Sequence, residues 1–116
     1  MATVTFESPL GWGTAQWVGL RPEEGATRQV ELGVPGVLTW GYEVAGTRHE
    51  ASIFEEEGRV CLVGRVRWSG EDGVTAVQVG SDLVLIQISN APSIVPAQLI
   101  IRAPRLQLFD VIACAA

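Results

Sequence analysis

Three arginines are the residues of this 116-residue chain whose type and spacing are best suited to binding chemistry. Arg59, Arg65 and Arg67 share one parity of the extended stretch 59–68, so a strand would present them on one face. Arginines beside exposed aromatic side chains are how small β-barrels hold single-stranded nucleic acid or another anionic ligand. The simpler interpretation is structural: a solvent-exposed face whose charges are balanced by acids on a neighbouring strand.

The chain also contains four tryptophans, which differ in their predicted environments. Trp40 and Trp68 have the parity of the apolar residues in their strands, and we expect both in the core. Trp12 stands between Gly11 and Gly13 in a predicted loop. Trp12 is therefore the best candidate for an exposed aromatic anchor, and it joins the three arginines as a candidate ligand-binding residue.

The sequence contains few residues that could form a catalytic site. His49 is the only histidine, so a histidine metal cluster is excluded and a nucleophile triad would have to use this residue. Cys61 paired with His49 gives a hydrolase hypothesis, but no local signature supports it, and both Cys61 and Cys114 are predicted to be reduced, buried thiols. We therefore assign no catalytic residue, metal ligand or cofactor, and the sequence favours a protein that is not an enzyme.

The acidic residues and glycines have structural explanations. Glu55, Glu56 and Glu57 predict a solvated hairpin tip, because calcium loops space their ligands instead of running three glutamates together. Asp110 lies within an apolar stretch: if buried it needs a partner, for which Arg102 or Arg105 is the candidate, and the alternative is a position on an exposed face. The glycines form no phosphate-binding loop, and the chain has no lysine to reach a phosphate.

The stretch 59–90 predicts the elements that would position these side chains. Residues 59–68 alternate as a half-buried strand, and residues 69–73 predict a turn. A second strand follows over 74–79, with a turn at 80–82. Residues 83–88 form a nearly unbroken apolar run, typical of a strand covered on both faces.

The rest of the chain also has the pattern of short extended segments separated by glycine and proline. We expect a hairpin between 38–44 and 47–54, and no stretch has a helical period. Further strands are predicted at 3–7, 14–20, 28–32, 97–102 and 105–113. The sequence predicts one all-β domain over 1–116, an antiparallel two-sheet sandwich or closed barrel of about 8–10 short strands with little or no helix.

Charge and composition narrow the functional classes. Thirteen acids against eight arginines give a net charge of −5, which weakens non-specific nucleic-acid binding. The sequence shows no signal peptide and no apolar run of the roughly 20 residues needed to span a bilayer, so a cytoplasmic location is the default expectation. The apolar stretch 106–116 is expected to pack into the sheet or against another subunit.

These observations favour a non-enzymatic binding or assembly module. It would act through protein–protein contact or self-association, with a protein partner or a homo-oligomer as the expected complex. The alternative is a small β-barrel that binds an anionic ligand or single-stranded nucleic acid through Arg59, Arg65 and Arg67.

Overall fold

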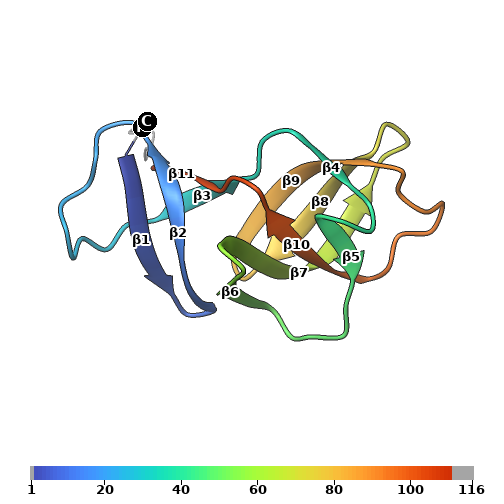
Figure 1. The fold of residues 1–116 in the computed structure, drawn as a ribbon, viewed down its shortest axis with the longest axis horizontal. Helices are drawn as coiled ribbons and strands as arrows, with labels where there is room; N and C mark the ends of the chain where they lie inside the picture. Colours follow the sequence, from blue (N-terminus) through green and yellow to red (C-terminus); the bar gives the residue numbers. More distant parts are fainter. Residues whose placement is uncertain (1, 111–116) are drawn as a thin grey trace, which may run out of the picture.

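The computed structural model describes residues 2–110 and folds them into eleven strands with no helix (Figure 1). The all-β prediction is confirmed. Within this range there is no helix with the length and apolar character needed to cross a lipid bilayer. The strands are β1 (Ala2–Ser8), β2 (Gly11–Val18), β3 (Val30–Gly33), β4 (Val37–Thr39), β5 (Val44–Gly46), β6 (Ser52–Glu56), β7 (Arg59–Ser69), β8 (Val74–Val79), β9 (Asp82–Ser89), β10 (Gln98–Ala103) and β11 (Gln107–Asp110).

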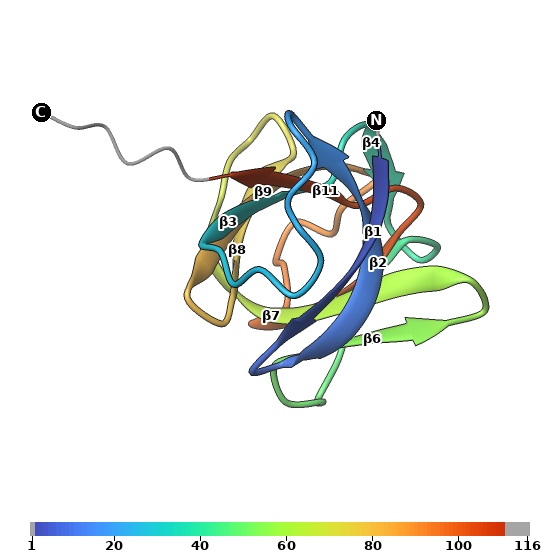
Figure 2. The ribbon, with the colours of Figure 1, turned by 90° about the vertical axis from the view of Figure 1, so that its left-hand side faces the viewer.

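The strands form one strongly curled, half-barrel sheet (Figures 1 and 2). Its main path runs β3-β11-β2-β6-β7-β8-β9-β4, with β1 added to β2 and β10 joining β7 to β5. Most ladders are antiparallel, as expected, but β2 pairs in parallel with β11 and β6, and β4 pairs in parallel with β9. In Figure 1 the hairpin β1–β2 lies with β3 and β11 at one end of the molecule.

The long strand β7 organises the sheet, because it changes partner halfway along one edge. Its first half pairs with β6 and its second half with β8, while β10 occupies the opposite edge. Gly64 lies at the change of partner. A Cβ atom there would overlap the carbonyl oxygen of Gln78 and lie 2.9 Å from Cγ1 of Val77. The absence of a side chain at Gly64 therefore allows β8 to fold closely over β7.

Tight turns connect the central strands as the sequence predicted. Glu57 and Gly58 have φ angles of 53° and 77° between β6 and β7, the conformation of a hairpin turn with a primed geometry. The β7–β8 turn is supported by the Asp72 side chain, whose Oδ1 accepts a hydrogen bond from the Val74 amide at 3.2 Å. The turn after β8 uses Gly80, with φ of 62°.

The predicted hairpin between 38–44 and 47–54 is wrong. The chain turns within the first of these stretches, where Gly41 has φ of 90° and the amide of Tyr42 donates to the carbonyl of Thr39. This turn separates β4 from β5, and the two strands pair with β9 and β10 instead of with β6. A glycine with positive φ inside an alternating apolar pattern had therefore marked a turn.

The core lies on the inner, concave side of the curl, where side chains from most of the strands meet. Its members include Trp17, whose Nε1 donates a hydrogen bond to the Leu20 carbonyl at 2.7 Å. Trp40 is partly buried and packs against this core. A second, smaller apolar cluster of Cys61, Val63 and Ile100 lies on the other face of β7 and β10.

Candidate functional site

The outer face of the sheet over β7, β8, β9 and β4 exposes several large apolar side chains. We define the outer apolar patch as Trp68, Leu83, Leu85 and Val37. Their side chains are 50%, 55%, 56% and 61% exposed, respectively. Large exposed apolar side chains that gather on one face indicate an interaction surface, whereas the same residues scattered singly would not.

Strand register brings the members of the patch together. Trp68 on β7 lies opposite Ala76 on β8, and Ala76 lies opposite Leu85 on β9. Residues opposite one another in a ladder share a face, with Cβ atoms about 5 Å apart. Ala76 is fully buried although it faces outward. Trp68, Ala76 and Leu85 therefore form an apolar row across three strands, with the small Ala76 side chain between two larger ones.

The patch continues along β9 in both directions. Leu83 lies two residues before Leu85 and opposite Gln78. On the other side Gln87 lies opposite Val37 of β4 and donates a hydrogen bond from Nε2 to the carbonyl of Asp72 at 2.6 Å. This hydrogen bond ties β9 to the β7–β8 turn and fixes the outer face at that end.

The predicted burial of Trp68 is wrong, and a β-bulge is the reason. Val66 pairs with Val77 but Trp68 pairs with Ala76, so the register shifts between them and Arg67 is the additional residue. Such an insertion turns the side chains that follow to the opposite face. Trp68 therefore lies outside while Val66 stays at the core.

The interpretation of 83–88 as a strand covered on both faces is also wrong. In β9, Val84, Ile86 and Ile88 are buried, whereas Leu83 and Leu85 are exposed on the opposite parity. The apolar run thus combines a core face with an apolar outer face. An unbroken apolar run within a mostly antiparallel sheet was the sequence signal for this surface.

The predicted arginine row is divided into two parts. Arg59 opens β7 opposite Glu56, whereas Arg65 and Arg67 are exposed in the second half of the strand. Arg65 lies six positions after Arg59, about 20 Å along a strand. Between them on the same face are the buried side chains of Cys61 and Val63. Only Arg65 and Arg67 lie near the outer apolar patch.

Trp12 is half exposed, as expected, but it does not lie in a loop. It belongs to β2 and faces Glu7 on β1. The actual hairpin turn is at Pro9 and Leu10, where Ser8 Oγ accepts a hydrogen bond from the Leu10 amide at 3.2 Å. Trp12 is therefore on β2, which β6 separates from β7 and Trp68 in the strand order, and it is not part of the outer apolar patch.

Cys61 and His49 have surroundings that do not suit nucleophilic catalysis. Cys61 is fully buried, and burial, with a further contribution from the charge of Glu56, raises the pKa of its thiol. A protonated, enclosed thiol is a poor nucleophile. His49 is exposed in the connection between β5 and β6. Cys114 lies outside the described residues.

Two acidic residues have partners that the sequence did not predict. Glu55 is not part of a solvated tip: its Oε1 accepts hydrogen bonds from the amide and the hydroxyl of Thr14, at 3.0 and 2.7 Å. Asp110 forms an ion pair with Arg28, with Nη1 and Oδ2 2.6 Å apart, instead of with Arg102 or Arg105. The antiparallel pairing of β11 with β3 brings Arg28 and Asp110 together.

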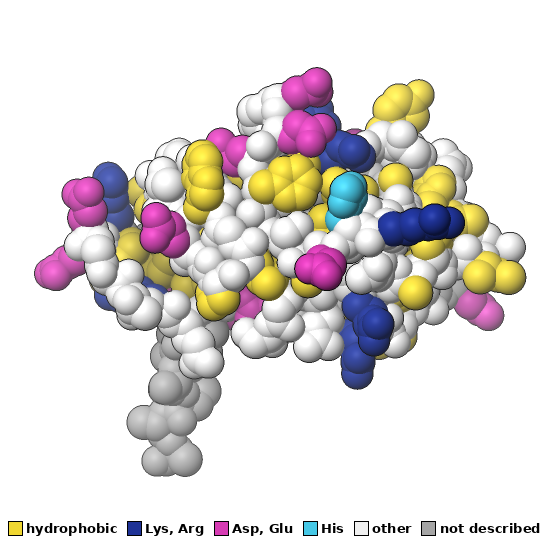
Figure 3. Space-filling model, turned by 90° about the horizontal axis from the view of Figure 1, so that it is seen from below, with side chains coloured by type: hydrophobic (Ala, Val, Ile, Leu, Met, Phe, Trp, Pro, Cys, Tyr) yellow, Lys and Arg dark blue, Asp and Glu magenta, His cyan; other side chains and the backbone are white. Residues whose placement is uncertain are grey.

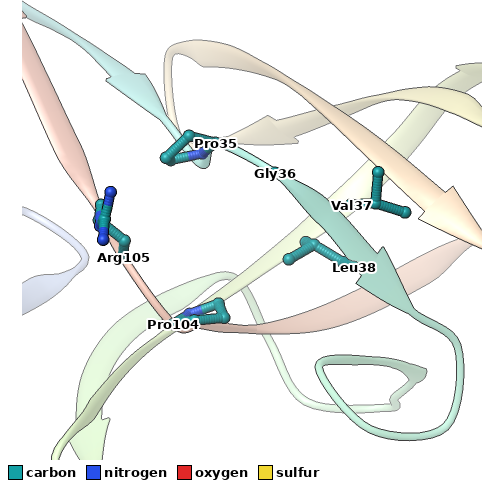
Figure 4. A pocket seen from close by; sticks show the side chains of 6 residues that line it. All are labelled: Pro35, Gly36, Val37, Leu38, Pro104 and Arg105. Atoms are coloured by element: carbon teal, nitrogen blue, oxygen red, sulfur yellow. The ribbon is translucent and has the colours of Figure 1, made fainter.

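The concave parts of the surface provide fewer groups that could bind a ligand than the outer face does. An open depression of about 360 Å³ lies between the β3–β4 and β10–β11 connections (Figure 4). Leu38 points into it, and Arg105 is its one charged lining residue. Within residues 2–110 no three His, Cys, Asp or Glu side chains are placed to share a metal ion. Figure 3 shows a face on which acidic and basic side chains are interspersed, with apolar side chains between them.

Comparison with models of protein families, with curated proteins and with solved structures finds no match to this chain. Its function is therefore inferred from the geometry of the outer face.

Proposed function

We propose that this domain is a non-enzymatic binding module that contacts a protein partner through the outer apolar patch. The observation that carries the proposal is the alignment of Trp68, Ala76 and Leu85 across three adjacent strands, with the two large side chains half exposed. A rigid sheet holds these side chains in place, so little conformational entropy is lost when a partner covers them.

The composition of the patch supports this function. An aromatic residue at its edge and aliphatic residues beside it are typical of the buried centre of a protein interface. Arg65 and Arg67 are exposed nearby on β7, and Gln78 lies between Arg65 and Leu83. This arrangement places polar side chains around an apolar centre, which is the usual anatomy of an interface.

A charge introduced into the patch tests the proposal. Tagged wild-type chain and Leu85→Glu are used to recover partners from lysate of the source cells, and the recovered proteins are quantified by mass spectrometry. Leu20→Glu is the matched control, because Leu20 is 94% exposed in the β2–β3 connection and lies outside the patch. We expect a defined partner that Leu85→Glu loses and Leu20→Glu retains, with purified partner bound at least tenfold more weakly by Leu85→Glu. Equal recovery by the two variants would contradict the proposal.

A second function is favoured by one specific observation: Arg65 shares the outer face with Trp68. A guanidinium group near an exposed indole ring is suited to an anionic ligand or to single-stranded nucleic acid, where bases stack on aromatic rings. Fluorescence anisotropy with a labelled oligothymidylate at low and moderate salt tests it. Arg65→Ala with Arg67→Ala would abolish salt-dependent binding, whereas Arg21→Ala with Arg48→Ala has the same net charge and would preserve it. No salt-dependent binding by the wild-type chain would exclude this function for oligonucleotides.

A further inference from the structure

The strand β1 has a long edge without a ladder. Its seven residues pair with β2 along one side in an unbroken register from Ala2–Trp17 to Ser8–Gly11, and the sheet topology of residues 2–110 gives it no other partner. The strands β3, β4 and β5, which also lie at ends of the sheet, have only four, three and three residues. β1 is therefore the edge best suited to accept another strand.

The hydrogen bonds of β2 show which backbone groups of β1 face this edge. The amides of Thr14 and Gln16 point away from β1, since they donate to Glu55 Oε1 and to the Leu106 carbonyl. Their partners in the ladder are Thr5 and Thr3. In an antiparallel pair such opposed residues direct their backbone groups away from each other. The N–H and C=O groups of Thr3, Thr5 and, by the same alternation, Glu7 therefore face the free edge.

Within residues 2–8, Glu7 is the one feature that could discourage pairing at this edge. Natural edge strands are interrupted by proline, lysine or a bulge, which prevent a second chain from adding to the sheet. Residues 2–8, ATVTFES, contain no basic residue and no proline, and their register with β2 is continuous. Glu7 is their one charged residue. Thr3 and Thr5 are exposed, whereas Val4 and Phe6 are partly buried against the core.

We propose that a second copy of this chain adds to the sheet here, with the two β1 strands antiparallel and centred on Thr5. In this register Thr5 faces Thr5, Thr3 faces Glu7 and Glu7 faces Thr3, so every edge-facing backbone group identified above finds a partner. On the inner face Val4 of one copy lies opposite Phe6 of the other. The inference goes beyond the proposed function, because it assigns self-association to a surface other than the outer apolar patch.

Self-complementarity argues for a second copy as the occupant instead of a foreign peptide. The Thr5-centred register places no like charges opposite one another, and a threonine hydroxyl faces each Glu7 carboxylate. It also covers the exposed parts of Val4 and Phe6 with apolar side chains of the other copy. A two-fold axis through Thr5 pairs the edge-facing backbone groups of both strands at once. Two-fold symmetry is the usual symmetry of homodimers.

Sedimentation equilibrium of the full chain over a concentration series tests the proposal. We expect a dimer whose dissociation constant rises at least tenfold in Thr5→Pro, because proline lacks the edge-facing N–H group yet leaves the β1–β2 hydrogen bonds in place. Thr5→Ala keeps the N–H group and should change the constant less than threefold. A wild-type chain that is monomeric up to about 1 mM would overturn the proposal.

Disulfide trapping tests the register without relying on a destabilising proline. In a Cys114→Ser background, Thr5→Cys places two thiols opposite each other at the centre of the dimer, at a Cα separation of about 5.5 Å. Thr3→Cys faces Glu7 of the other copy and has no thiol partner. We expect rapid oxidative cross-linking of Thr5→Cys only. Equal cross-linking of both variants would overturn the Thr5-centred pairing.

The same measurement on Leu85→Glu separates the two proposals. Because β1 and the outer apolar patch use different strands, Leu85→Glu should keep the dissociation constant of the wild-type dimer while losing its protein partner. A dimer lost in Leu85→Glu but retained in Thr5→Pro would assign self-association to the outer patch and overturn the β1 pairing.

Discussion

The carboxylate of Glu55 takes the place of a missing ladder between β2 and β6. These strands share one paired position, Gly11 with Ile53, and beyond it the amide of Thr14 has the Glu55 side chain as its acceptor. The same oxygen accepts from the Thr14 hydroxyl. This side chain therefore extends the connection between β2 and β6 beyond the Gly11–Ile53 pair.

Replacing Glu55 should weaken the connection between β2 and β6 and lower the stability of the fold. Glu55→Ala removes the acceptor of two hydrogen bonds to a charged group, and we expect it to lower the free energy of unfolding by about 2–3 kcal/mol. Thr14→Val removes only the hydroxyl and should cost about 1 kcal/mol. Urea denaturation followed by tryptophan fluorescence measures both. A loss for Glu55→Ala no larger than that for Thr14→Val would show that the Thr14 amide is satisfied by water.

Cys61 provides a second prediction, concerning reactivity. Because burial raises its pKa, the thiol should be protonated and enclosed at neutral pH. In a Cys114→Ser background, a thiol-specific reagent should label Cys61 much more slowly in the folded chain than in urea. Fast labelling of the folded chain at pH 7 would instead indicate an activated thiol and would favour the hydrolase hypothesis.

The residues of the outer apolar patch show what sequence reasoning at this scale can and cannot predict. The sequence correctly predicted which side chains of β7 face the core up to Val66. No residue type marks the bulge that follows, so the sequence assigned Trp68 to the wrong face of the strand. Leu83 and Leu85 were visible as apolar residues at strand positions. Their exposure depends on whether another layer covers β9, which is a property of the whole fold.

At the scale of elements, the pairs that the sequence predicted are those with local turn signals. The hairpins β6–β7, β7–β8 and β8–β9 follow from Gly58, Gly73 and Gly80 in their turns. The parallel ladders of β2 with β11 and of β4 with β9 join segments far apart in the chain. No turn encodes such pairs, so they depend on how the whole sheet curls, and the sequence did not predict them.

The approach of β3 to β9 should be visible in the pH dependence of stability. Burial, and then the charge of Glu31 on β3, raise the pKa of Asp82 at the start of β9. A raised folded pKa means that the folded state binds the proton more tightly. The stability contributed by this proton is present below the unfolded pKa and is lost as the pH rises through the folded pKa.

Asp82→Asn should therefore be more stable than the wild-type chain at neutral pH, and the difference should disappear in acid. Glu31→Gln should lower the Asp82 pKa towards its ordinary value, which an NMR titration of the carboxyl carbon can follow directly. Glu24→Gln, in the β2–β3 connection, is the control of equal charge. The same Asp82 pKa in Glu31→Gln and Glu24→Gln would show that β3 and β9 are not close enough to interact.

At the scale of the whole molecule, the curl of the sheet depends on Gly64. This residue lies where β7 exchanges β6 for β8, and β8 passes directly over the position that a side chain would occupy. Since backbone atoms of Gln78 form that contact, no rotamer change can relieve it. The same crossing aligns Trp68, Ala76 and Leu85, so the outer apolar patch depends on it as well.

Gly64→Ala should therefore destabilise the fold strongly, by about 3 kcal/mol or more, although alanine suits a strand better than glycine does. Gly25→Ala is the control: Gly25 has φ of 81° and no atom within 4 Å of the position that a Cβ would take, so only backbone strain of about 1–2 kcal/mol applies. Thermal unfolding by circular dichroism compares the two. If Gly64→Ala were no worse than Gly25→Ala, β8 could move away from β7 without loss, and the curl would have to be held by the ladders on either side of this crossing.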